Sequence, residues 1–182
     1  VLGIFALVIG VLWGGYYYFV EEGDGGNLSE NQSGVALYKY VHQVGNVTYN
    51  LYFESPLSEV EEMDYSIEPD KYDVLNTVNF RMAFMEYNGS DNGQVAKAST
   101  KLTSFLKFVY HFKFGNESFG SVDEFSCENS TIRNKVITFD PYENVTGIFM
   151  DERGCIEFKS DDPRKMVDLV DKFMYEMVEI NG

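Results

Sequence analysis

The chain is poor in basic residues: 14 Lys and Arg stand against 29 Asp and Glu, and the formal net charge at pH 7 is −15. A nucleic-acid-binding protein needs a basic surface to displace counterions from the phosphate backbone, so this balance argues strongly against that class. Aromatic residues make up 16 % of the chain, which argues against a disordered protein. The 182 residues provide room for one domain, or for one domain with an appendage.

Charge is missing altogether from the first twenty residues, Val1 to Val20, which read VLGIFALVIGVLWGGYYYFV. Twenty helical residues span about 30 Å, the thickness of a bilayer's hydrocarbon core, and this run is apolar on all sides. We therefore expect an N-terminal long hydrophobic helix, transmembrane or in a filament core. The alternative is a secretory signal core, but such cores run about 7–15 residues and end at small residues. This run ends in Tyr16, Tyr17, Tyr18 and Phe19.

Acidic residues follow this run directly, whereas the first basic residue is Lys39. Positive residues collect on the cytoplasmic side of a membrane. We therefore predict that the acidic remainder of the chain lies outside the cell, anchored at the cell surface or assembled in a filament.

The start of the chain has neither a Met nor a basic leader ahead of the apolar run. Type IV prepilin processing removes a short basic leader and leaves the apolar helix in place, and in this architecture the chain resembles archaeal type IV pilins. Bacterial-type pilins usually carry Glu at the fifth mature position, where this chain has Phe5. The other explanation is that the sequence omits a leader, in which case the segment is a plain single-span anchor.

The resemblance implies a structural subunit of an extracellular pilus-like filament, with a homo-oligomeric core of N-terminal helices and an acidic, adhesive head. The alternative function is a single-span membrane-anchored extracellular binding module, or an accessory subunit of a cell-envelope complex. Small residues in the apolar run would let helices approach closely in either case. These helix-packing residues are Gly3, Ala6, Gly10 and Gly14.

Composition divides the chain into the helix 1–20, a Gly/Ser/Asn-rich linker 21–34 and a head domain 35–182. Within the head, the runs on either side of Gly45-Asn46 predict a β-hairpin between Val35 and Phe53. Alternation of apolar and polar residues predicts further strands. These strands are Val78–Phe84, Leu106–Phe114, Lys135–Phe139, Val145–Met150 and Cys155–Lys159, and the segment Gln94–Thr103 fits a helix or a strand.

The C-terminal part changes to a helical period. Asp162 suits the N-cap and Pro163 the first helical position of a helix that runs to about Ile180. Its apolar residues should pack on the sheet, while Asp168, Asp171, Lys172 and Glu176 take the opposite face. The expected fold class is α+β: a mainly antiparallel β head with a C-terminal amphipathic helix.

Seven N-x-S/T sequons predict N-linked glycans on an exported protein, against about 1.4 expected by chance. The alternative is that Asn and Ser simply favour turns. The predicted acceptors are Asn27, Asn31, Asn46, Asn88, Asn116, Asn129 and Asn144. The two cysteines, Cys127 and Cys155, form an even pair and predict a disulfide in an exported domain, with free thiols as the alternative.

Motifs of catalysis or cofactor binding are missing from the chain. His42 and His111 lie in β-patterned runs, and no nucleophile elbow, phosphate-binding glycine loop, HExxH or CxxCH motif accompanies them. An acidic cluster suggests a calcium site only weakly, because the EF-hand spacing is missing. Its members are Glu59, Glu61, Glu62, Asp64, Glu68, Asp70 and Asp73. We therefore expect no enzyme activity, no metal and no cofactor.

Overall fold

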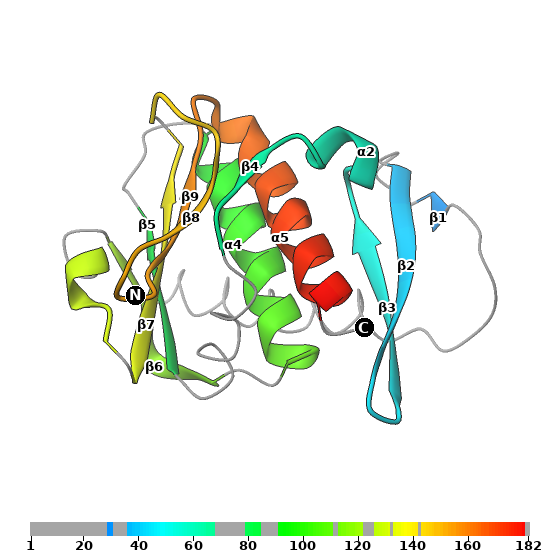
Figure 1. Cartoon of the computed structure of the whole chain (residues 1–182), viewed down its shortest axis with the longest axis horizontal. Coiled ribbons are helices and arrows are strands. Elements are labelled where there is room, and N and C mark those ends of the chain that lie inside the picture. The colour runs from blue at the N-terminus through cyan, green and yellow to red at the C-terminus, as the bar shows by residue number, and fades with distance from the viewer. Residues whose placement is uncertain are drawn as a thin grey trace.

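A computed structural model describes residues 29–30, 36–67, 79–84, 91–110, 113–121, 126–131, 133–141 and 143–180. The two longest helices form the middle layer, between a six-stranded sheet and the β2–β3 hairpin (Figure 1). The chain therefore folds as three layers, with α4 and α5 covered on both sides. The predicted helix Val1–Val20 lies outside the described residues.

The hairpin forms as the sequence predicts. Strands β2 (Ala36–Val44) and β3 (Val47–Phe53) pair antiparallel, with Val44 opposite Val47. Gly45 has a φ of 61°, which a glycine adopts at little cost in a two-residue hairpin turn. The short strand β1 (Ser29–Glu30), which lies within the predicted linker, pairs with the start of β2.

The larger sheet has the strand order β4-β8-β9-β7-β5-β6. Its strands are β4 (Asp64–Tyr65), β5 (Asn79–Phe84), β6 (Lys113–Ser121), β7 (Asn134–Asp140), β8 (Gly147–Met150) and β9 (Ile156–Lys159). Four of its neighbouring pairs are parallel, and only β8 and β9 run antiparallel. The prediction of a mainly antiparallel head is therefore wrong.

Crossover connections explain the parallel pairing, because a parallel neighbour can be reached only by a chain that returns across the sheet. Helix α4 (Asp91–Phe108) is such a crossover between β5 and β6. Its buried residues Ala98, Leu102, Phe105 and Leu106 recur at helical spacing. The predicted strand Leu106–Phe114 is wrong, since its first three residues belong to α4 and strand β6 begins at Lys113.

The C-terminal helix follows the prediction. Asp162 accepts a hydrogen bond from Arg164 N, a 3₁₀ turn η3 covers Pro163–Lys165, and α5 (Met166–Ile180) continues from it. Phe173 of α5 contacts Phe158 of β9 edge to face. Tyr175 stacks on Phe53 of β3, with ring centroids 3.8 Å apart. The core is thus continuous from the sheet through α5 to the hairpin.

Two charged residues on the predicted polar face of α5 are buried in the fold. Asp171 is fully buried and Lys172 is 6 % exposed, because the hairpin and the short helix α2 (Leu57–Val60) cover this side. Both residues lie on the side of α5 away from the sheet, but this side is covered and not open to solvent. Within the described ranges, moreover, no helix combines the length and the apolarity that a membrane crossing requires. The fold class predicted with a long hydrophobic N-terminal helix is corrected accordingly: the described chain is a mixed, mostly parallel sheet with the two long helices α4 and α5, the short helix α2 and a hairpin.

Candidate functional site

The predicted disulfide is confirmed between Cys127 and Cys155, whose Cα atoms lie 5.3 Å apart. Cys127 opens a 3₁₀ turn η2 (Cys127–Asn129), and Cys155 immediately precedes β9. Cys155 is fully buried and packs against Val136 of β7. The bridge therefore ties the loop before β7 to the start of β9, an interior strand of the six-stranded sheet.

Local hydrogen bonds hold the turn that presents Cys155. Asp151 Oδ1 accepts from Arg153 N at 2.9 Å and from Cys155 N at 2.7 Å. The buried Lys135 donates to Arg153 O at 2.5 Å. Burial lowers the pKa of Lys135, and the nearby Asp151 carboxylate partly offsets this effect. A Cβ on Gly154, which has a φ of +74°, would lie 2.6 Å from the Lys135 ammonium, so the turn requires glycine there.

Three of the seven predicted glycosylation acceptors are exposed: Asn46, Asn129 and Asn144. Asn46 lies in the hairpin turn, where Val47 and Thr48 are also exposed. Asn116 lies within β6. Asn27, Asn31 and Asn88 lie outside the described residues, as do the helix-packing residues Gly3, Ala6, Gly10 and Gly14.

Asn129 has a second role beside its place in a sequon. Its Oδ1 accepts from Ser126 N at 2.8 Å and from Ser126 Oγ at 3.2 Å, which closes the cap of η2. A glycan is attached to the amide nitrogen and leaves Oδ1 free to accept these bonds. Glycosylation at Asn129 is therefore compatible with the cap, two residues from the disulfide.

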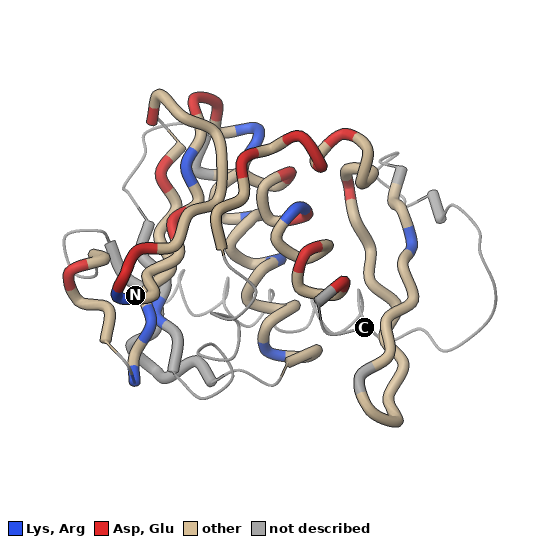
Figure 2. The backbone as a smooth tube through the Cα atoms, viewed as in Figure 1, with Lys and Arg blue, Asp and Glu red and all other residues tan. Residues whose placement is uncertain are grey.

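Only four of the seven residues of the predicted acidic cluster lie in the described part of the chain. Glu59, Glu61, Glu62 and Asp64 are exposed along α2 and β4, where Figure 2 shows acidic positions gathered. Glu68, Asp70 and Asp73 lie outside the described residues. In the part of the chain that the structure covers, no three His, Cys, Asp or Glu side chains are grouped to hold a metal ion.

His42 is buried, 3 % exposed, on the core side of β2. Its Nε2 lies 3.4 Å from Tyr110 Oη, and burial lowers its pKa. Tyr110 also donates to Met177 O at 2.9 Å, so the pair joins the hairpin to α5. His111 lies outside the described residues.

Sequence reasoning missed a buried charge network where β3 meets the two helices. Asp171 Oδ2 of α5 accepts backbone N–H groups from Glu54 at 2.8 Å and Ser55 at 3.0 Å. Asp171 Oδ1 pairs with the ammonium of Lys101 from α4. Glu54 pairs with Lys97 and lies 3.9 Å from Lys101. One carboxylate thus joins three elements, and the only sequence signal is that Asp171 interrupts an apolar run.

Neighbouring side chains complete this joint. Ser55 Oγ donates to Asp168 Oδ1 at 2.5 Å, and Tyr175 Oη donates to Ser55 O at 3.2 Å. Burial raises the pKa of Asp171, against the opposing effects of Lys101 and of the two backbone donors. Burial and the Asp171 charge also raise the pKa of Tyr175. These polar groups are hydrogen-bonded or ion-paired to one another, so the network connects α4, α5 and the end of β3.

The outer edge of β2 is largely unpaired by other described strands. Strand β1 pairs with β2 at Ala36 and Leu37 only, and among the described residues no strand pairs with that edge beyond them. Large apolar side chains are exposed on the hairpin. They are Tyr38 at 38 %, Tyr40 at 40 %, Val41 at 57 % and Val47 at 51 %. Residues 31–53 hold no Asp or Glu, and the hairpin carries a single charged residue, Lys39 (Figure 2).

Comparisons with protein-family models, curated proteins and solved structures find no match to this chain.

Proposed function

We propose that the chain is a structural subunit of an extracellular pilus-like filament, with a glycosylated, acidic, adhesive head and with copies in contact through the β2–β3 hairpin. The observation that carries this proposal is the open, acid-free edge of β2 with its exposed apolar residues. An unpaired strand edge is a template for pairing with another chain, and native proteins usually protect such edges with charge. Here the edge carries only Lys39.

Charge favours contact between copies at this surface. Two chains of net charge −15 repel each other over most of their surfaces. Beyond Leu37 the hairpin presents exposed apolar side chains and carries no carboxylate of its own, so a second copy that docks there removes apolar area from water. A contact of this kind that repeats without closing produces a filament.

Two further features support an exported protein. The disulfide between Cys127 and Cys155 is typical of oxidising compartments outside the cytosol. The side chains of three sequon asparagines, Asn46, Asn129 and Asn144, are exposed on the folded head. The apolar segment 1–20 belongs to the proposal as the part of the chain that enters a membrane or the filament interior. The proposal includes no catalytic activity and no cofactor.

Electron microscopy of material sheared from the surface of the source cells tests the proposal. We expect filaments that contain this chain, with glycans detected by mass spectrometry at exposed sequons. The variant Val41→Lys places a second charge on the hairpin and should abolish filaments or shorten them strongly. Leu57→Lys is the matched control, because Leu57 is an exposed apolar residue, at 38 %, that belongs to α2 and not to the hairpin.

Two outcomes would contradict the proposal. If the chain is found only as a monomer in the membrane fraction, the single-span anchored binding module or envelope accessory subunit becomes the better assignment. If filaments form equally well with Val41→Lys, the hairpin is not the contact between copies.

A further inference from the structure

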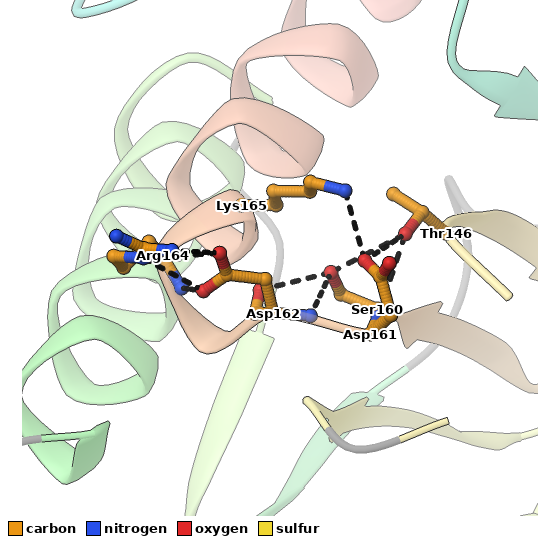
Figure 3. Close-up of polar contacts among 6 residues, drawn as sticks. All are labelled: Thr146, Ser160, Asp161, Asp162, Arg164 and Lys165. Carbon is orange, nitrogen blue, oxygen red and sulfur yellow. Dashed lines mark hydrogen bonds and ion pairs between the residues drawn. The ribbon is translucent and has the colours of Figure 1, made fainter. Parts of the chain in front are cut away.

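The sequon at Asn144 contacts the segment that leads into the C-terminal helix. Its hydroxyl residue, Thr146, directly precedes β8, and Figure 3 shows the Thr146 side chain directed at the Ser160–Asp161 segment that leads into η3. Thr146 Oγ1 donates to Asp161 Oδ1 at 2.8 Å and accepts from Asp161 N at 3.4 Å. It also lies 3.5 Å from Ser160 Oγ. Both the donor and an acceptor position of this hydroxyl are therefore in use.

The partner carboxylate is itself held in place. Lys165 Nζ contacts the same Asp161 Oδ1 at 2.8 Å, one helical turn along the chain. On the neighbouring residue, Asp162 accepts Arg164 N at 2.9 Å and also pairs with the Arg164 guanidinium. Hydrogen bonds with Lys165 and Thr146 lower the pKa of Asp161, so it stays charged at neutral pH. Thr146 is thus part of the structure that begins α5.

A sequon is recognised through this hydroxyl, because the motif accepts Ser or Thr at its third position and no apolar residue of similar shape. In the folded domain the transferase would have to separate Thr146 from Asp161 before reading it. The sequon at Asn46 provides the contrast. Asn46, Val47 and Thr48 are all exposed at the end of the hairpin.

We infer that Asn144 is a glycan acceptor only until the Ser160–Lys165 segment docks on Thr146, whereas Asn46 stays available on the folded domain. The inference rests on the proposed function, since it assumes an exported chain that meets a glycosyltransferase. In the transfer, Asn144 Nδ2 bonds to the anomeric carbon of a lipid-linked oligosaccharide. The lipid phosphate leaves with the bonding electron pair, and one amide proton passes to a base of the transferase. Occupancy of Asn144 therefore records whether the transferase acted before folding was complete.

A reconstituted reaction tests this inference. The substrates are the folded full-length chain and two short peptides that carry the sequons of Asn46 and Asn144. The reagents are a lipid-linked oligosaccharide and a purified oligosaccharyltransferase that accepts any N-x-S/T sequon, and mass spectrometry measures the occupancy of each site. Each rate on the folded chain is divided by the rate on the matching peptide. We expect this ratio to be at least about tenfold lower for Asn144 than for Asn46, because hydrogen bonds of Thr146 must break first.

The variant Asp161→Ala removes the acceptor of the Thr146 hydroxyl. It should raise the rate at Asn144 of the folded chain and leave the rate at Asn46 unchanged. Glu59→Ala is the matched control, since Glu59 is an exposed acidic residue on α2 outside these contacts. An unchanged circular dichroism spectrum and melting temperature show that Asp161→Ala is still folded. If Asp161→Ala melts at a lower temperature than the wild type, a second variant replaces it. This variant, Thr146→Ser, keeps the sequon and the hydroxyl and should retain the low rate at Asn144.

Equal ratios for Asn144 and Asn46 on the folded wild-type chain would overturn the inference, as would no response at Asn144 in a folded Asp161→Ala. The outcome is separable from the proposed function. Mass spectrometry of the chain purified from its source cells shows whether it is glycosylated in those cells. The rates in the reconstituted reaction depend only on which sequons are accessible on the folded chain.

Discussion

Replacing Asp171 with Ala should destabilise the domain by about 3–5 kcal/mol, the usual cost of removing one partner of a buried ion pair. The Asp171 carboxylate is fully buried, pairs with Lys101 and accepts the backbone N–H groups of Glu54 and Ser55. Truncation takes this acceptor from all three donors. The nearest remaining carboxylate for Lys101 is Glu54 Oε1, 3.9 Å away, so the ammonium is only partly compensated.

A second variant separates the charge from the backbone bonds. In the double variant Lys101→Met with Asp171→Ala, the Lys101 ammonium is removed together with its carboxylate partner, but Ser55 N still loses its acceptor at a buried position. An unsatisfied buried donor costs about 1–3 kcal/mol. We therefore expect the double variant to be more stable than Asp171→Ala alone, by about 1 kcal/mol or more.

Urea unfolding followed by far-UV circular dichroism measures these differences. Glu157→Ala is the control, because it removes an ion pair with Lys159 in which both side chains are 25 % exposed. Such a partly solvated pair contributes below about 1 kcal/mol. If Asp171→Ala costs no more than Glu157→Ala, the buried carboxylate does not join the hairpin to the helices, and the reasoning is refuted.

Two further predictions concern the disulfide and the start of α5. Replacing Cys127 and Cys155 with Ser opens a loop with a sequence separation of 28 residues, and the chain-entropy model predicts a loss of about 3–4 kcal/mol. The urea midpoint measures this loss, and the reduced wild type should unfold at the midpoint of the double variant; a higher midpoint would contradict the model. Hydrogen bonds with Arg164 lower the pKa of Asp162 from 3.8 to about 2, so its stabilising effect is present above pH 3.8 and is lost as the pH falls through about 2. Asp162→Asn should therefore melt below the wild type at pH 6 and match it below pH 2, whereas a difference that persists in acid would exclude this charge effect.

Features with a local cause could be predicted from the sequence. The Gly45-Asn46 turn, the Asp162 cap and the Cys127–Cys155 pair each depend on a few residues whose chemistry fixes the outcome. The helix α5 was recognisable because its apolar residues recur at a helical period over four turns.

Features that depend on distant parts of the chain could not be predicted. Alternating aromatics between Leu106 and Phe114 fit a strand, but contacts of Leu102, Phe105 and Leu106 with the core make the first part helical. Parallel pairing in the sheet follows from crossovers, which strand patterns do not reveal. Asp171 looked like a solvent-facing residue because nothing local shows that the hairpin returns to cover it.

The order of elements along the chain has a consequence for biogenesis. Helix α5 comes after every strand, yet it supplies the surface on which the sheet and the hairpin are both buried. During synthesis, the apolar sides of these earlier elements lack the part of their cover that α5 provides until residues 166–180 have left the ribosome. We therefore expect the domain to be completed only once translation has passed Ile180.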